Sequence, residues 1–343
     1  MAIQPDILAT TLRILRDKEV DNTFRTTPIL EATQRLGNVE TVDGGSKVDS
    51  PVILTDHSTI TQLSTGYEAV NLAVKDPFRT SSYEWCDFVA PVVMTKKEET
   101  SNKGERAIVR IYEGRMKQVM GMLRREVSKQ LIAGNSSILT DLQTLNGFSA
   151  AAGTGWFEGE AFGSQSNTVG GIAKSGFPAS WQNQSQTAGA AFGTNGLRAM
   201  SRIFIDAQTY APEGDIDLIL ASPTSYELYK NELQSLERYT SANEQRNMVG
   251  KLGLKYNGAD MFIEPNLGYN GTVDKAGATV KPISMFFLNS SLFSVYFDQD
   301  GQFELEEATP ISGYAATAFQ IFVRMQICTS NLSGHGVLYD AEA

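Results

Sequence analysis

Residues 103–134 constrain the fold of this chain more than any other segment. Apolar side chains recur there at steps of three or four, which is the spacing of one face of an α-helix. They are Ile108, Ile111, Tyr112, Met116, Val119, Met120, Leu123, Val127 and Leu131. Residues 100–102 can cap the start of the helix, and Gly134 and Asn135 can adopt the left-handed conformation that ends one. At 1.5 Å per residue the helix is about 45 Å long. We therefore expect it to brace several substructures or a neighbouring chain; the alternative is a long core helix.

Size and charge narrow the class of protein. The chain has 343 residues, of which 41% are apolar and 20% charged, enough for two or three domains with sizeable cores. A net charge of −10 argues against a surface that coats nucleic acid, although local basic patches are compatible with it. The sequence has no secretion signal or apolar run of membrane-spanning length, so we expect a cytosolic chain. Cys86 and Cys328 are then expected as buried thiols rather than a disulfide.

The N-terminal part is expected to be elongated. Residues 5–20 have the pattern of a short amphipathic arm helix, and residues 23–36 are expected to be irregular. Residues 38–79 alternate polar and apolar side chains around two turns, which indicates a β-ribbon. An isolated two-stranded ribbon is marginally stable in water. The ribbon therefore either finds a partner or is a flexible loop of a monomer. Residues 82–95 predict a strand that leads into the long helix.

Residues 149–195 are dominated by Gly, Ala, Ser, Gln, Asn and Thr, a composition typical of long loops. Trp156, Phe157 and Trp181 within this stretch are expected to pin the loops to a surface. From Gly196 the pattern becomes that of a compact α/β unit. The expected elements are a helix at 197–210, a strand at 216–221, a helix capped by Ser222 and Pro223 that runs to about 236, and a hairpin at 256–259.

The last segment is expected to contain strands at 283–288, 292–297 and 318–328. A turn at 298–301 is expected to fold the second of these strands back into residues 302–307. Residues 331–339 are expected as a short polar exit with one more hydrophobic pair.

The sequence offers no catalytic, cofactor-binding or metal-binding motif. His57 and His335 are the two histidines, and neither has a ligand partner at suitable spacing. There is no nucleophile elbow, phosphate loop or dinucleotide-binding glycine motif. Asp298 and Asp300 resemble part of a calcium loop, but the other acidic ligands are missing, so a hairpin turn is the better explanation. We therefore predict that the chain is not an enzyme and needs no cofactor.

The long helix is basic, although the chain as a whole is acidic. Residues 103–129 contain eight basic and three acidic residues. Three interpretations fit: salt bridges to adjacent subunits, sequence-independent contacts with nucleic-acid phosphates, or an ordinary solvated helix face. The candidate subunit-contacting or DNA-facing residues are Arg106, Arg110, Arg115, Lys117, Arg124, Arg125 and Lys129.

The order of these elements and several local motifs resemble a known family. The motifs are Thr-Val-Gly-Gly-Ile at 168–172, Trp-Gln-Asn-Gln at 181–184, the strand–helix pair at 217–226 and the ending at 331–338. Together they are similar to the major capsid proteins of tailed bacteriophages that share the Hong Kong 97 fold. The resemblance covers nearly the whole chain, and none of its motifs is catalytic.

The resemblance implies an α+β fold with five parts. They are an N-arm at 1–37, an extended β-ribbon loop at 38–80, a peripheral domain at 81–195 with the spine helix at 103–134, an axial α/β domain at 196–282, and closing strands at 283–343 that return to the peripheral domain. Candidate contacts of the extended loop are Gly44, Gly45, Lys47 and Asp49.

By the same resemblance, the chain would assemble into hexamers and pentamers of an icosahedral shell around double-stranded DNA, with each extended loop lying across a neighbour. The implied location is the virion, after synthesis in the host bacterial cytoplasm. Implied partners are a separate scaffold protein, because the arm begins close to Met1, a portal and decoration proteins. We expect non-covalent assembly, because the residues of the founding member's lysine–asparagine cross-link cannot be assigned here. The alternatives are an encapsulin-type nanocompartment shell and a monomeric hydrolase.

Overall fold

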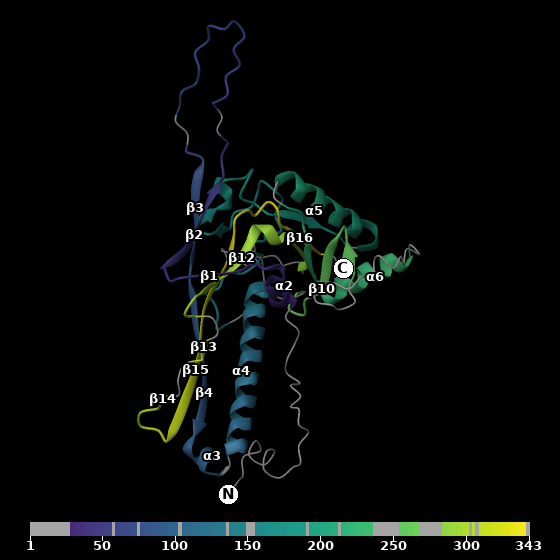
Figure 1. Cartoon of the computed structure of the whole chain (residues 1–343). Coiled ribbons are helices and arrows are strands. Elements are labelled where there is room, and N and C mark those ends of the chain that lie inside the picture. The colour runs from purple at the N-terminus through teal and green to yellow at the C-terminus, as the bar shows by residue number, and fades with distance from the viewer. Residues whose placement is uncertain are drawn as a thin grey trace.

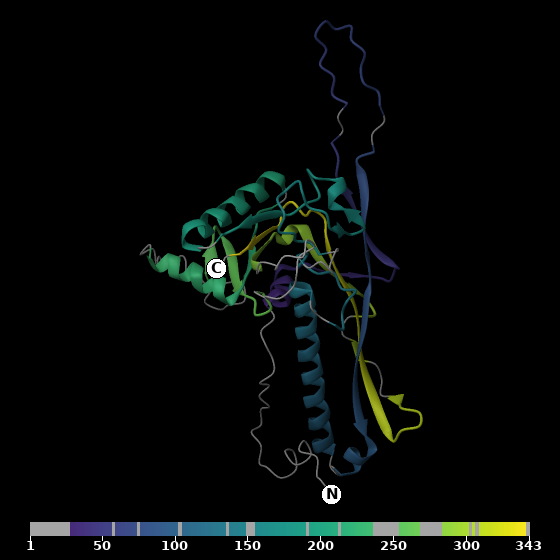
Figure 2. The same ribbon diagram turned by 180° about the vertical axis from the view of Figure 1, so that it is seen from behind.

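The computed structural model describes residues 28–340, apart from 57–58, 74–75, 102–104, 135–136, 149–154, 190–191, 212–213, 236–253, 268–282, 302–303 and 306–308. Side chains at 35, 99, 101, 105–113, 234–235, 304–305 and 309 are also outside the description. The expected arm helix at 5–20 and His57 therefore lie outside the described residues. The described part contains two six-stranded sheets, two two-stranded sheets, a long helix beside the first six-stranded sheet, and a loop that projects far from the body (Figures 1 and 2).

The first sheet is built around β15 (Ala316–Thr329), the long apolar strand that the sequence predicts. One edge of β15 pairs antiparallel with β4 (Cys86–Thr95) over ten residues. The other edge receives three strands in succession, and the first of them also pairs in parallel with β1. The three strands on this edge are β12 (Phe293–Asp298), β13 (Glu304–Leu305) and β14 (Thr309–Pro310), and the strand beyond β12 is β1 (Val39–Val42).

One predicted pairing in this sheet is wrong. The turn after β12 is present, since the Gly301 N–H donates to Asp298 O at 3.1 Å, but β13 pairs with β15 and not with β12. The reason is that β15 is long enough for β12 to occupy only its residues 325–329, leaving the next part of the same edge free for β13.

The long helix α4 (Glu105–Ala133) lies beside β4 and follows the short helix α3 (Lys96–Ser101) (Figure 1). The predicted helix is confirmed within two residues at each end. Leu123, Val127 and Leu131 are buried, as their spacing predicts. Gly134 follows the helix with φ +63°, the left-handed conformation expected at its end.

Residues 23–36, which we expected to be irregular, contain the helix α2 (Pro28–Leu36). Ile29 and Ala32 bury one face of α2 in the main core, near the end of α4. Pro28 at the first helical position and Gly37 just after the last, with φ +76°, are the sequence signals of this helix. The prediction was wrong because the helix is only nine residues long, although Ile29, Ala32 and Leu36 stand at the spacing of one helix face.

The second sheet has the strand order β7-β16-β11-β8-β10-β9 and carries two helices. The strands are β7 (Gln184–Thr187), β8 (Leu218–Ala221), β9 (Lys255–Tyr256), β10 (Ala259–Ile263), β11 (Ile283–Leu288) and β16 (Gly336–Tyr339), and the helices are α5 (Leu197–Tyr210) and α6 (Pro223–Ser235). The predicted 197–210 helix, the 283–288 strand and the hairpin at Asn257 and Gly258 are confirmed. The prediction of a polar exit is wrong, because β16 is an interior strand with Val337 and Leu338 fully buried.

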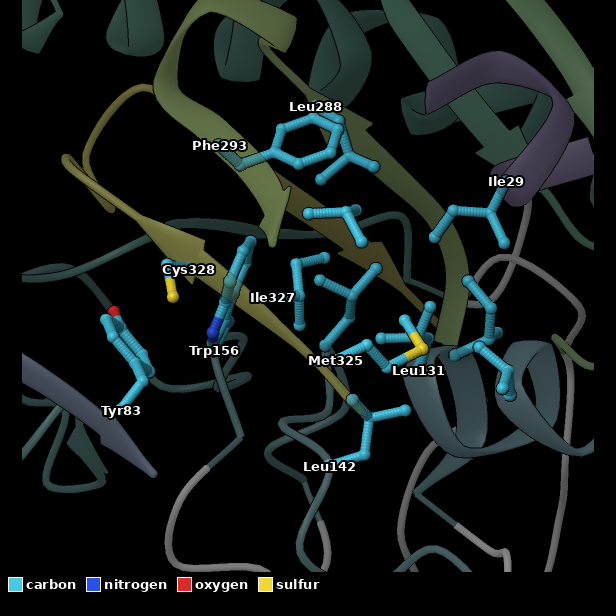
Figure 3. Packing of buried hydrophobic residues seen from close by; sticks show 14 of the residues in the cluster. Ile29, Tyr83, Leu131, Leu142, Trp156, Leu288, Phe293, Met325, Ile327 and Cys328 are labelled. Carbon is cyan, nitrogen blue, oxygen red and sulfur yellow. The ribbon is translucent and has the colours of Figure 1, made fainter. Parts of the chain in front are cut away.

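Alternate residues of the second sheet belong to two different cores. Ile219 of β8 packs in a cluster with Met200 and Ile203 of α5. Leu218 and Leu220 belong to the main core, together with residues of α4 and of the first sheet. Figure 3 shows this main core, with Leu131, Met325, Ile327 and Leu288 gathered in one cluster. The second sheet thus separates the helix α5 from the body that contains α4.

The stretch with low sequence complexity is mostly loop, as predicted, with the short strands β5 (Thr168–Val169) and β6 (Ile172–Ala173) in its described part. Its aromatic residues anchor the loops, as predicted, but they do so in the interior and not on a surface. Trp156 and Phe157 are completely buried, and Trp181 is 1% exposed. Buried amide side chains bind the loop backbone: Asn183 Nδ2 donates to Glu158 O at 3.1 Å, and Gln165 Nε2 donates to Asn183 O at 2.7 Å. These loops can enter the core because their polar groups find partners there.

Candidate assembly interface

The predicted ribbon is formed by β2 (Lys47–Ile53) and β3 (Phe78–Glu84), which pair antiparallel from Lys47↔Glu84 to Ile53↔Phe78. Side chains alternate between its two faces. Val48, Val52 and Tyr83 on one face are buried against the body of the molecule. Most side chains of the opposite face are exposed, so this face is available to another molecule.

The predicted loop contacts Gly44 and Gly45 lie in the turn between β1 and β2, with φ +69° and +102°. The Gly44 N–H donates to Asp298 Oδ1 at 3.4 Å, and Arg324 Nη2 donates to Gly45 O at 3.4 Å. Arg324 also forms ion pairs with Asp87 and Asp298. The turn is therefore fixed to the first sheet, at the base of the ribbon.

Lys47 and Asp49, the other two predicted contacts, are on the exposed face but have partners within the ribbon. Lys47 Nζ lies 2.8 Å from Glu84 Oε1, and this pairing raises the pKa of Lys47 and lowers that of Glu84. Asp49 Oδ1 accepts a hydrogen bond from Ser82 Oγ. Their role in contacts between subunits remains a prediction.

The ribbon continues into a projecting loop, residues 54–77, in which no described residue belongs to a strand (Figure 1). We expected strand alternation through Ile60 and Leu63, and that expectation is wrong. The loop and the adjoining strand ends carry large apolar side chains that are each more than half exposed: Ile53, Ile60, Leu63, Tyr67, Val70, Leu72 and Phe78. So many exposed apolar side chains on one projection are typical of a protein-binding surface. Sequence reasoning missed Tyr67 and Leu72, although apolar residues in a polar, turn-rich stretch are a usable signal.

The tip of this loop has a defined conformation. The Glu68 carboxylate accepts hydrogen bonds from the N–H groups of Ser64 and Thr65 at 3.0 and 3.2 Å. These two hydrogen bonds lower the pKa of Glu68. Gly66, with φ +78°, allows the tight turn between these residues. Tyr67, 98% exposed, is held at the apex of this turn.

The predicted basic residues of α4 fall into separate groups. Arg115 binds within the chain: Nη2 lies 2.8 Å from Glu98 Oε1, and Nη1 donates to Val93 O at 3.1 Å. Lys117 and Arg124 are exposed, and Arg125 and Lys129 are half-buried. Within the part of the chain that the structure describes, these last four residues make no ion pair. The side chains of Arg106 and Arg110 lie outside the description.

Groups suited to catalysis do not converge in the described residues. His335 is completely buried, and burial lowers its pKa to about 3. No group of three or more His, Cys, Asp or Glu residues in the described ranges could hold a metal ion. Cys86 and Cys328 are buried free thiols, as predicted. No helix in the described part of the chain combines the length and apolar character that a membrane span needs.

The sequence matches no protein-family model and no curated protein. The structure, by contrast, is similar to solved shell proteins along almost its whole length. It matches the cyanophage A-1(L) capsid with a TM-score of 0.64 and 15% identity, covering 96% of each chain. It matches the capsid of the empty GTA particle with a TM-score of 0.58 and 11% identity, covering 97% of each chain.

A third similar structure is the holo-SrpI encapsulin complex from Synechococcus elongatus PCC 7942. Its TM-score is 0.55 at 10% identity, and the match covers 99% of this chain and 96% of that one. At such identities the likeness shows the fold. The chain therefore has the Hong Kong 97-type capsid fold that its sequence resembles. The boundaries of the arm and of the domains are not tested by this likeness and remain predictions.

Proposed function

We propose that this chain is the major capsid subunit of a tailed phage and that copies of it assemble into hexamers and pentamers of an icosahedral shell. The observation that carries this proposal is the exposed apolar loop at 54–77 on a chain with a capsid fold. A surface of this kind is costly in water and is stabilised when another molecule covers it. The role is structural, with no chemical step for the chain to perform.

In this proposal the five predicted parts keep their boundaries, from the N-arm at 1–37 to the closing strands at 283–343. The shell encloses double-stranded DNA, and the unpaired cations of α4 are candidates for contact with its phosphates. A separate scaffold protein, a portal and decoration proteins are the proposed partners. The chain is made in the bacterial cytoplasm and ends in the virion.

An encapsulin-type nanocompartment is a second candidate, supported by the similarity to the SrpI encapsulin complex. The two candidates share a shell and differ in its contents. A phage head holds nuclease-protected DNA, whereas a nanocompartment of this type holds protein cargo.

Expression of the full chain, followed by size-exclusion chromatography and electron microscopy, tests the proposal. We expect closed particles of uniform size. A stable monomer under all assembly conditions would contradict the proposal. Nuclease-protected DNA in particles from infected cells separates the two shell functions. In a denaturing gel, mature particles should give one band near 37.4 kDa, because assembly is expected to be non-covalent.

The variant Arg124→Glu/Arg125→Glu tests the basic helix. It should reduce particle assembly or DNA retention while leaving the helix content of the unassembled subunit unchanged. Normal DNA-filled particles from this variant would contradict a role for these two residues.

A further inference from the structure

A buried carboxyl group lies where the second sheet meets the long helix. Glu264 follows β10 directly, and its N–H donates to Ala221 O, at the end of β8, at 2.9 Å. Its Oε1 accepts hydrogen bonds from the backbone N–H and from Nδ2 of Asn266, at 3.3 and 2.9 Å. The same Nδ2 also donates to Ser128 Oγ of α4 at 3.3 Å. Asn266 therefore connects the Glu264 carboxyl group to the helix.

This carboxyl group is completely shielded from water. Glu264 and Ser128 are both 0% exposed, and Glu264 Oε2 is buried without a hydrogen bond from the described residues. The turn after β10 is closed by the Leu267 N–H, which donates to Glu264 O at 3.2 Å. Leu267 belongs to the main core, together with Leu131 of α4. Ionisation of Glu264 therefore places a negative charge inside this core, where burial makes it costly.

No described cation compensates for such a charge. The strands β8 and β11 contain no charged side chain. The described charged residues on the other elements nearby are Asp260 of β10, Glu31 of α2, Glu227, Lys230 and Glu232 of α6, and Arg124, Arg125, Glu126 and Lys129 of α4. Within the described ranges none of them forms an ion pair with Glu264, and Asp260 is paired with Lys255. Burial therefore dominates, and it raises the pKa of Glu264 from 4.5 to about 7.

We propose that this junction is a proton-controlled latch between the second sheet and α4. With Glu264 protonated, the neutral carboxyl group stays buried and Asn266 bridges it to Ser128. When the carboxyl group ionises, it gains water only if the turn at 264–267 moves away from the helix. The protonation of one side chain then controls how firmly two parts of the subunit are held together. This inference goes beyond the proposed function, since it concerns a single subunit.

The direction of the pH dependence follows from the two states of the latch. In the closed state the pKa of Glu264 is about 7, and in an opened state the carboxyl group regains its ordinary value of 4.5. Between these values the closed state holds a proton that the open state has lost, so rising pH favours opening. Once both states are ionised, the effect levels off. From pH 6 to pH 8 the opening equilibrium should increase about tenfold.

Hydrogen exchange followed by mass spectrometry on the unassembled full chain tests the latch. After correction for the intrinsic exchange rate at each pH, peptides covering 259–267 should exchange about tenfold faster at pH 8 than at pH 6. Glu264→Gln keeps a hydrogen-bonding side chain and removes the titration, so it should lose this difference. The matched control Glu227→Gln removes an exposed carboxyl group from α6 and should keep it.

A second measurement keeps the test decisive if Glu264→Gln folds poorly. In the unaltered chain, labelled with 13C at the glutamate carboxyl carbons, the Glu264 resonance should titrate near pH 7, and its loss in Glu264→Asp assigns it. The inference is overturned if this resonance titrates near 4.5, or if residues 259–267 of the unaltered chain exchange equally at pH 6 and pH 8. It is also overturned if Glu264→Gln keeps the full difference. Failure of the chain to form a shell would contradict the proposed function alone, because both measurements use single subunits.

Discussion

A lysine is completely buried in the main core. Lys174 Nζ donates hydrogen bonds to Gln165 Oε1 and Asn183 Oδ1 at 3.1 and 2.9 Å and lies 3.4 Å from Glu158 Oε1. The Glu158 carboxylate in turn accepts hydrogen bonds from the backbone N–H groups of Ser166 and Asn167. A buried charge is tolerated only when it is surrounded by partners in this way. The cluster therefore fixes the conformation of the loops around it.

Removal of the lysine alone should be strongly destabilising. Lys174→Met leaves the Glu158 carboxylate buried without its cation, and we expect a loss of about 3–5 kcal/mol in the free energy of unfolding. Urea denaturation of the unassembled subunit measures it. Adding Glu158→Gln to Lys174→Met should recover part of the loss, because no net charge then remains in the cluster. Equal stability of Lys174→Met and the unaltered chain would show that the ion pair is not needed.

His335 makes the stability depend on pH. Its Nδ1 accepts from the Asn289 N–H at 3.1 Å, so the neutral ring carries its proton on Nε2, which faces Thr329 Oγ1 at 3.4 Å. Burial lowers its pKa from 6.5 to about 3. Below pH 6.5 the unfolded chain therefore binds a proton that the folded chain does not, and stability falls as the pH falls from 6.5 towards 3.

The measurement compares unfolding free energies at pH 7, 6, 5 and 4 for the unaltered chain and for His335→Gln. The unaltered chain should lose up to about 1.4 kcal/mol more per pH unit than the variant over this range. The carboxylates titrate in both proteins, so their contributions to the pH dependence of stability cancel in the difference. Parallel pH curves would mean that His335 is not held neutral in the folded chain.

At the level of elements, the Arg115 side chain joins the N-terminal half of α4 to the first sheet. The two Arg115 terminal nitrogens contact the two carboxylate oxygens of Glu98 at 2.8 and 3.2 Å, and one of them also binds Val93 O in β4. The Arg115 hydrogen bonds hold the pKa of Glu98 near 2. The contact therefore joins α3, α4 and β4 at the end of the molecule far from the loop (Figure 1).

Arg115→Ala should loosen this end without unfolding the chain. We expect the free energy of local unfolding at this end to fall by only about 1–2 kcal/mol, because the Arg115–Glu98 pair is partly exposed to water. Hydrogen exchange followed by mass spectrometry should show faster exchange in peptides covering 93–101 and unchanged exchange in β11. The neighbouring variant Lys117→Ala is the control and should match the unaltered chain. Unchanged hydrogen exchange in residues 93–101 after Arg115→Ala would show that the Arg115 contacts with Glu98 and Val93 do not stabilise this end.

At the scale of the whole molecule, the projecting loop is separable from the fold. Its described residues are almost all exposed, and the Leu54–Pro77 hydrogen bond brings its two ends together. The two cores, in contrast, share the second sheet and depend on one another.

Replacement of residues 55–76 by a short Gly-Ser linker should therefore leave the subunit folded. We expect a melting temperature within a few degrees of the unaltered subunit and no closed particles, because the loop contributes to contacts between molecules and not to the cores. Calorimetry and electron microscopy measure the two effects. Closed particles formed by the shortened chain would show that the loop is dispensable for assembly.

The sequence alone determined the elements whose signals are local. The apolar period of α4 with its glycine stop, the apolar run of β15, the capped start of α6 and the hairpin at 257–258 each depend on neighbouring residues, and each was predicted. The order of these elements was enough to suggest the fold. The basic character of α4 could also be predicted, because charge is a property of composition.

Only the tertiary structure decided what depends on distant partners. The pairing of β13 with β15, the interior position of β16 and the burial of Trp156 and Lys174 rest on contacts between residues far apart in sequence. Periodicity carries no information about such contacts, because they form wherever the folded chain leaves an edge or a cavity to fill. The same holds for the candidate interface. Arg115 is paired within the chain and the apolar side chains of the loop at 54–77 are exposed, because folding sets which side chains find partners in their own molecule.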